Sequence, residues 1–385
     1  MKKILITNST CLQDNIGGAS RAIHETLLEL SKKHHVTLLV PNRNNKKQFE
    51  KINENYVIVR YPYDSKNKVS KLFSSIKFFL KGNEYIKKQY YVFWGQSAGP
   101  YFYLVLFTKL NKIKNKIYTF HGPWYEEYTF ASGKKNIFLK YMINFIEKII
   151  IKYSDTIHFQ SNFIKEKILE NHKSLESKKT KVLNILINPT QYQNKIYPSI
   201  EKLVKNEKLN LFIIRRLTPR TGVLNFIKNI NLLDDDIKCK LNINIAGQGT
   251  EFKEIELYIK DNKMCDFITL LGEITQEKAD ILIHKSHYVV MPSLAAEGFG
   301  VTVLEALYQE TEVLYANNGG MKEFLSDTYP NNKFDPMNFE SIKSILHQKL
   351  EIIKSNDFNK IFREVDSNLN FQNNLKELLE FDYEK

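Results

Sequence analysis

Two glutamates, Glu297 and Glu305, stand eight residues apart in the sequence, and Gly298 and Gly300 follow the first of them. The stretch begins after an apolar run at residues 288–291 and continues into a segment with helical apolar spacing. A strand, a glycine-containing loop and a helix start together direct backbone N–H groups toward a phosphate. Two carboxylates beside such a loop can accept hydrogen bonds from sugar hydroxyls. The stretch therefore predicts a site for a sugar nucleotide.

Three arginines, Arg215, Arg216 and Arg220, lie within six residues directly after another apolar run at residues 209–214. A guanidinium group binds phosphate through two parallel hydrogen bonds, so this cluster at the end of a strand predicts an anion clamp. A solvated loop is the alternative. Gly247 and Ile274 also follow predicted strands, at residues 242–246 and 267–271.

The first half of the chain contains two further candidate positions. Gly17 and Gly18 precede a helical pattern and could let the backbone approach a diphosphate, although a strand-to-helix turn often contains glycine in any case. His121 follows a predicted strand at residues 116–120 and precedes Gly-Pro. There it could bond a ligand hydroxyl or phosphate, or serve only the structure.

Strand and helix patterns alternate along the whole chain, which predicts parallel sheets with helices on both faces. At 385 residues the chain is too long for one core. We expect a first Rossmann-like, acceptor-binding domain at residues 1–190 and a second, nucleotide-sugar-binding domain at 191–365. A C-terminal helix within 366–385 is expected to cross back to the first domain.

Composition narrows the class of protein. Hydrophobic residues make up 43% of the chain and charged residues 26%, as in soluble globular proteins. Three dispersed cysteines predict neither a disulfide framework nor a zinc site, and they favour the cytoplasm. We expect no membrane span, because the longest uncharged apolar runs are far shorter than the ~20 residues a spanning helix needs.

The positive charge lies in the first half of the chain. Residues 1–190 carry 32 Lys and Arg against 14 Asp and Glu, whereas the remainder carries 24 against 29. A lysine-rich genome should raise the lysine content of both halves, yet only the first half is basic. We therefore expect the first half to meet an anionic membrane surface, a lipid phosphate or an acidic glycan. The basic segment 66–88 has amphipathic helical spacing and could lie on lipid or pack on the sheet. No nucleic-acid motif is present.

Taken in order, these motifs resemble those of the retaining glycosyltransferases of family 4, which have the GT-B fold. Residues 297–305 match the family's E-x7-E motif, and Arg216-Leu217 with Gly222 matches its Gly-Arg-Leu…Lys-Gly loop. The motifs at Gly17-Gly18 and His121-Gly122 match two donor-site motifs of the N-terminal domain. The resemblance implies two Rossmann-like domains whose parallel sheets face each other across a cleft.

By this resemblance the donor nucleotide diphosphate lies in that cleft. Arg216 would bind the diphosphate and Glu305 the ribose. Glu297 would hold the sugar together with the backbone amides that follow it, and His121 would contact the sugar near the reacting centre. The expected catalytic residues are His121, Glu297 and Arg216. The expected donor-binding residues are Gly17, Gly18, Arg216, Arg220, Gly247, Ile274, Glu297, Gly298, Phe299, Gly300, Val301 and Glu305.

One departure from the family concerns the clamp. The family's usual lysine falls at Thr221, and Arg220 stands one residue earlier. We expect Arg220 to supply the missing cation. The family also acts without a metal, so we expect neither a metal nor a cofactor, only a nucleotide-sugar donor, and a UDP-sugar rather than a GDP-sugar.

The resulting hypothesis is a retaining hexosyltransferase that builds a surface polysaccharide or glycolipid on a membrane-bound, lipid-linked acceptor. Such an enzyme would be cytoplasmic and peripheral on the inner face of the membrane. Two alternatives stay open: a transferase with a soluble small-molecule or protein acceptor, and a non-catalytic GT-B partner subunit.

Overall fold

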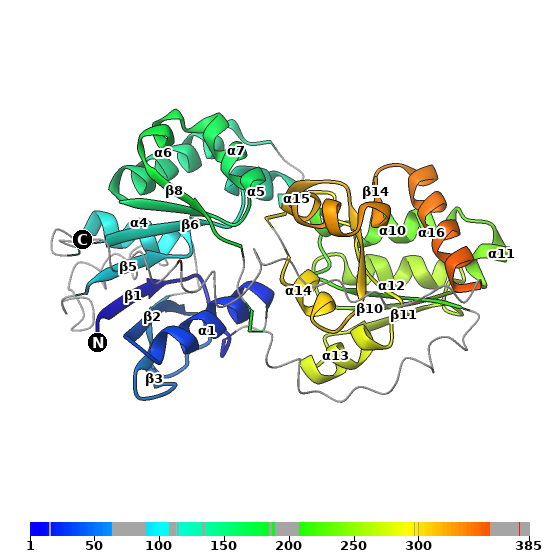
Figure 1. Ribbon diagram of the computed structural model, residues 1–385, viewed down its shortest axis with the longest axis horizontal. Coiled ribbons are helices and arrows are strands. Elements are labelled where there is room, and N and C mark those ends of the chain that lie inside the picture. The colour runs from blue at the N-terminus through cyan, green and yellow to red at the C-terminus, as the bar shows by residue number, and fades with distance from the viewer. Residues whose placement is uncertain are drawn as a thin grey trace. The chain divides into compact units, whose positions relative to one another are not determined.

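The computed structural model of the chain describes residues 1–14, 17–63, 90–107, 113, 115–132, 135–184, 187–188, 208–295, 297–298, 300–354 and 377 (Figure 1). These residues form two compact units, one within Met1–Tyr125 and Asn136–Ile187, the other within Glu126–Lys135 and Asn188–Asn370. The predicted basic helix at 66–88, the linker at 190–207 and, except for Glu377, the C-terminal segment 366–385 lie outside the described residues.

The first unit contains an eight-stranded sheet in the order β3-β4-β2-β1-β5-β6-β7-β8. Its pairs are parallel except for the edge pair β3 and β4. The strands are β1 (Lys3–Thr7), β2 (His35–Asn42), β3 (Phe49–Lys51), β4 (Tyr56–Pro62), β5 (Val92–Gly95), β6 (Asn115–Phe120), β7 (Thr156–Phe159) and β8 (Lys179–Val182). The helices in these ranges are α1 (Gly18–Ser31), α4 (Ala98–Phe107), α6 (Ile137–Tyr153) and α7 (Asn162–Asn171), with a 3-10 turn η2 (Lys173–Ser177). Helix α5 (Trp124–Ser132) begins in the first unit and continues into the segment Glu126–Lys135 of the second.

The second unit contains a six-stranded parallel sheet in the order β11-β10-β9-β12-β13-β14. Its strands are β9 (Leu209–Ile214), β10 (Leu241–Ala246), β11 (Ile268–Gly272), β12 (Tyr288–Met291), β13 (Glu312–Ala316) and β14 (Lys333–Phe334). Its helices are α10 (Val223–Asn231), α11 (Asp235–Lys238), α12 (Phe252–Asp261), α13 (Gln276–His284), α14 (Val301–Leu307), α15 (Gly319–Thr328) and α16 (Phe339–Lys354), with 3-10 turns η3 (Pro219–Thr221) and η4 (Pro330–Asn332).

Helices cover both faces of each sheet, as the alternation of strand and helix patterns predicted. Successive side chains of a strand point to opposite faces. In β1, Ile4 and Ile6 pack in a core cluster with Leu27 of α1, whereas Leu5 packs with Tyr101 of α4 and with residues of α6 and α7. The second unit repeats this arrangement, because neighbouring residues of β9 contribute to two different clusters. The predicted α/β architecture is therefore confirmed, with the antiparallel strand β3 as an addition.

Each sheet has one point where the direction of winding reverses. In the first unit, β1 lies between β2 and β5, so the chain builds one side of the sheet after β1 and the other side from β5 onward. In the second unit, β9 lies between β10 and β12 in the same way. Ligands of such sheets bind at the carboxyl ends of the strands beside this reversal. A ligand site is therefore expected at the loops that follow β1, β5 and β6 in the first unit, and at those that follow β9 and β12 in the second.

Candidate functional site

In the second unit, the loops after β9 and β12 meet through a buried ion pair between Arg215 and Glu297. The Nη2 atom of Arg215 donates to the Glu297 carboxylate, and its Nη1 atom donates to Ser293 Oγ at 2.9 Å. Both paired side chains are only 8% exposed. Arg220 lies close as well, with Nη2 at 3.8 Å from the same carboxylate oxygen. The reversal point of this sheet therefore holds one carboxylate between two guanidinium groups.

The backbone around Glu297 is held by neighbours on several sides. The amides of Leu294 and Ala295 donate to the carbonyl oxygen of Arg220 at 3.0 and 3.1 Å. On the other side, the Gly320 amide at the start of α15 donates to the carbonyl oxygen of Glu297 at 2.8 Å. Such fixation on main-chain atoms keeps the carboxylate in one position, which a group that orients a ligand requires.

Arg216 differs from its neighbour Arg215. Its side chain is exposed and makes no hydrogen bond or ion pair with any other described residue. The sequence places Arg215 in the cluster of three arginines but indicates no separate role for it. The structure shows that Arg215 holds Glu297 and that Arg216 is open to an incoming ligand. The diphosphate role predicted for Arg216 stays a prediction.

The position of the family's clamp lysine is closed to solvent. Thr221 is 2% exposed, and its hydroxyl lies 2.7 Å from the carbonyl oxygens of both Arg216 and Thr218. Gly222 follows with a φ of +71°, and a Cβ atom there would lie 2.0 Å from the carbonyl oxygen of Pro292. The loop at residues 218–222 is thus packed against the Glu297 loop. With Thr221 in place of the family's lysine, Arg220 is the residue of this loop that brings a positive charge near the Glu297 carboxylate.

Packing within the second unit requires glycine at two of the predicted donor-site positions. Gly247 has a φ of +132°, and a Cβ atom there would come within 1.8 Å of the carbonyl oxygen of Arg215. Gly300 has a φ of +91° and lets α14 start beside Met291, whose Cε would be 3.0 Å from an added Cβ. Both glycines keep the loops around the ion pair close together, whatever else they contact.

The remaining predicted residues of this unit lie on or beside α14. Glu305 and Val301 are part of the helix and are each 6% exposed, and Gly298 is buried in the preceding loop. Ile274 packs, partly buried, against the core cluster that includes α14 residues. Phe299 lies outside the described residues.

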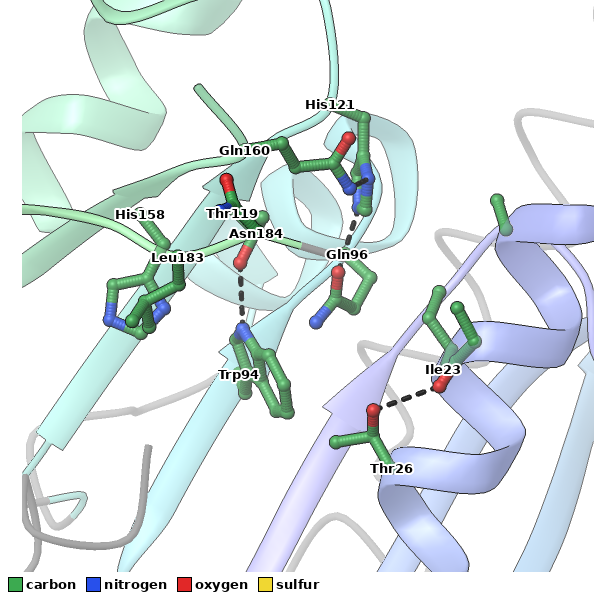
Figure 2. A pocket seen from close by; sticks show the side chains of 12 residues that line it. Ile23, Thr26, Trp94, Gln96, Thr119, His121, His158, Gln160, Leu183 and Asn184 are labelled. Atoms are coloured by element: carbon green, nitrogen blue, oxygen red, sulfur yellow. Dashed lines mark hydrogen bonds between the residues drawn. The ribbon is translucent and has the colours of Figure 1, made fainter. Parts of the chain in front are cut away.

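In the first unit, the ends of β5, β6 and β7 and the beginning of α1 line a pocket of about 50 Å³ (Figure 2). His121 is one of its lining residues, directly after β6. The others include Trp94 and Gln96 from the end of β5, Gln160 after β7, and the apolar side chains Ala19, Ala22 and Ile23 of α1. The pocket is large enough for a few water molecules. The sequence predicts His121 at this position but gives no signal for the two glutamines and Trp94.

The two glutamines define the state of the His121 ring. Gln160 donates its amide N–H to Nδ1, and Nε2 lies 2.7 Å from Gln96 Oε1 (Figure 2). These contacts fit a neutral imidazole that carries its proton on Nε2. Burial lowers the pKa of His121 to about 4, against the hydrogen bonds that raise it. His121 is therefore a neutral N–H donor at physiological pH.

Gly17 borders this region at the start of α1, and its surroundings are open. A Cβ atom there would meet nothing within 4 Å, and its φ of −159° is accessible to any residue. The loop before it is anchored by Asp14, which pairs through both oxygens with Arg60 at 2.9 Å. Arg60 is 1% exposed and also pairs with Glu50 at 2.6 Å. No contact among the described residues requires glycine at position 17, so the space beside it is open to a ligand.

Two family models match the chain in succession. "Glycosyltransferase Family 4" matches residues 16–190 and "Glycosyl transferases group 1" matches residues 197–364. Together they include every residue of both candidate sites. The chain is a GT-B glycosyltransferase.

Known proteins similar to this glycosyltransferase agree with the two matches. An uncharacterized glycosyltransferase of Methanocaldococcus jannaschii is 24% identical over 379 residues, which cover 94% of each chain. The O-antigen chain mannosyltransferase RfbU of Salmonella typhimurium is 23% identical over 218 residues, 56% of each chain. Among solved structures, sucrose-phosphate synthase of Thermosynechococcus elongatus has a TM-score of 0.79 at 15% identity and covers 99% of this chain and 98% of its own.

A second solved structure, HepE of Anabaena in complex with UDP and glucose, has a TM-score of 0.73 at 13% identity and 99% coverage of both chains. At these identities the solved structures show the fold, and they are GT-B glycosyltransferases. No helix within the described part of this glycosyltransferase is both long and apolar enough to cross a membrane.

Proposed function

We propose that this glycosyltransferase moves a hexosyl group from a UDP-sugar to a membrane-bound, lipid-linked acceptor with retention of anomeric configuration, in the synthesis of a surface polysaccharide or glycolipid. The observation that carries the donor half is the Arg215–Glu297 pair, with Arg220 beside it and Arg216 exposed, at the reversal point of the second sheet. The UDP bound in the HepE complex supports the choice of a UDP-sugar over a GDP-sugar as donor.

In this proposal the arginines divide the work. Arg216 and Arg220 bind the diphosphate, because a guanidinium group matches phosphate geometry and the Arg216 side chain has no partner among the described residues. Arg215 holds Glu297 so that one carboxylate oxygen can accept bonds from sugar hydroxyls. Glu305 binds the ribose hydroxyls, as the family resemblance implies.

The chemical step depends on charge. As the bond between sugar and diphosphate breaks, negative charge grows on the leaving diphosphate and positive charge on the sugar ring. Cations held in place before the reaction stabilise that separation without reorganising, which is usually the largest catalytic contribution. The His121 ring, held neutral between Gln96 and Gln160, contacts the sugar near the reacting centre and places no positive charge beside the developing cation. The residues proposed here do not need a metal.

A donor screen tests the proposal. Purified protein is incubated with a panel of UDP- and GDP-sugars and a lipid extract as acceptor, and nucleoside diphosphate release is measured with and without EDTA. We expect release from one UDP-sugar, unaffected by EDTA, and a product whose anomeric proton coupling matches that of the donor. Inversion of the anomeric centre would refute the retaining mechanism. Binding of UDP without turnover of any donor would favour the non-catalytic partner subunit instead.

A further inference from the structure

Helix α6 (Ile137–Tyr153) is apolar on the side that faces solvent. Its inner side packs in the core of the first unit, where Ile143, Ile150 and Ile151 are at most 1% exposed. On the opposite side, Ile137, Phe138 and Tyr141 are each 70–78% exposed and Phe145 is 60% exposed. The exposed apolar side chains, with Met142, recur at positions i, i+1, i+4, i+5 and i+8, which places them on one helix face.

This face is unusual for a helix that already has a buried side. Surface helices normally carry polar residues opposite their core-facing stripe. Contiguous exposed apolar residues mark a surface that binds something. The outer face of α6 therefore needs a partner that accepts aromatic and aliphatic side chains.

The charged residues that α6 itself places on this face are lysines. Lys148 and Lys152 continue the same face toward the C-terminal end of α6, and Lys135 and Lys140 flank its beginning; all four are exposed. The single acidic residue of α6, Glu147, points inward, where its carboxylate pairs with His172 Nε2 at 2.7 Å. The surface thus combines an apolar patch with a set of lysines that no acid of the helix neutralises.

We propose that the outer face of α6 docks on an anionic lipid bilayer. Its aromatic and aliphatic side chains enter the boundary between headgroups and acyl chains, and its lysines bind lipid phosphates. A second copy of the chain fits less well, because a two-fold contact would bring the lysines of this face together. This inference deepens the proposed function, on which it rests for the location of the acceptor.

Vesicle co-sedimentation of the full chain provides the test. Wild-type protein is compared with F138S/F145S on phosphatidylcholine vesicles and on vesicles with 30% phosphatidylglycerol, at low and high salt. The matched control is Leu257→Ser, which changes a 59% exposed apolar residue on α12 of the second unit. We expect wild type and the control to bind the anionic vesicles at low salt, and F138S/F145S to bind at least tenfold more weakly.

The lysines are tested in the same way. Lys148→Gln and Lys152→Gln should each weaken binding to anionic vesicles about fivefold at low salt, the effect of one lysine near a charged membrane surface. Lys260→Gln, at an exposed site on α12, should leave it unchanged. All of these substitutions are at exposed positions, so the thermal midpoints should match wild type.

Three results would overturn the inference: no wild-type binding to anionic vesicles at low salt, equal binding by F138S/F145S, or a wild-type dimer in gel filtration that F138S/F145S dissociates. UDP calorimetry and donor turnover on the same samples separate the two proposals. Turnover without vesicle binding rejects the docking surface and leaves glycosyl transfer standing. Vesicle binding that depends on Phe138 and Phe145, without turnover of any donor, supports the docking surface and rejects the proposed enzyme.

Discussion

Replacing Arg215 by methionine should destabilise the second unit and abolish transfer, for separable reasons. Methionine fills a similar volume but leaves the Glu297 carboxylate, 8% exposed, without its closest cation. Breaking a buried ion pair from one side costs about 3–5 kcal/mol. In a unit of this size that corresponds to a fall in the unfolding midpoint of roughly 6–20 °C. Arg220, at 3.8 Å, can offset only part of this cost.

A double-mutant cycle separates stability from activity. In R215M/E297Q neither group carries a charge, so most of the lost stability should return. Transfer should not return, because Glu297 is proposed to bind the sugar. Calorimetry with UDP should still show binding by E297Q alone, because the diphosphate is proposed to contact Arg216 and Arg220.

Arg216→Met is the matched control, because it changes an exposed arginine one residue away. Its unfolding midpoint should stay close to wild type. Its kcat/KM should fall about 10²–10³-fold, the usual loss of one preorganised charge donor. The reasoning is refuted if R215M unfolds at the wild-type temperature, or if R216M retains full turnover.

Three further predictions concern the first unit. Gly17→Ala should leave the unfolding midpoint unchanged, because an added Cβ meets nothing within 4 Å, and should raise the KM for donor or acceptor; an unchanged KM would remove Gly17 from the site. Burial lowers the pKa of His121 to about 4 and that of His158 to about 3, so the folded state binds fewer protons than the unfolded chain below about pH 6.5. Denaturation in urea should therefore show stability that is complete above pH 6.5 and falls toward pH 4, while the pH–rate profile shows no ionisation of His121 near 6.5. Asp14→Asn should cost about 3 kcal/mol in urea denaturation, because the Arg60 guanidinium, 1% exposed, loses its two-oxygen partner, and a loss below 1 kcal/mol would contradict this.

Most strands of both sheets could be predicted because apolar runs alternated with amphipathic helices at regular intervals. The predicted strand at residues 242–246, for example, is β10 (Leu241–Ala246) in the structure. The short strand β3 was missed, since Phe49–Lys51 is too short and too polar to show a pattern. It forms through pairing with β4, a long-range contact that local sequence does not encode.

The site was predictable where chemistry and spacing coincided. Glu297 and the arginine cluster followed predicted strands, and the sheet order places their loops side by side. Which arginine pairs with Glu297 depends on the direction in which each side chain leaves the loop, and spacing carries no such information. Gln96 and Gln160 were missed for a related reason: neutral amides give no charge or motif signal, and 64 residues separate them.

The burial of Thr221 limits how this loop can be redesigned. A lysine placed there to restore the usual family residue would bury its ammonium group where a hydroxyl now lies between two carbonyl oxygens. The next residue, Gly222, cannot be exchanged on its own either, because a Cβ atom there would lie 2.0 Å from the carbonyl oxygen of Pro292. A chimera that imports the lysine must therefore import the whole turn from Thr218 to Gly222. In this loop the cation stands at position 220 and position 221 is buried, so moving the charge by one residue also requires a different backbone.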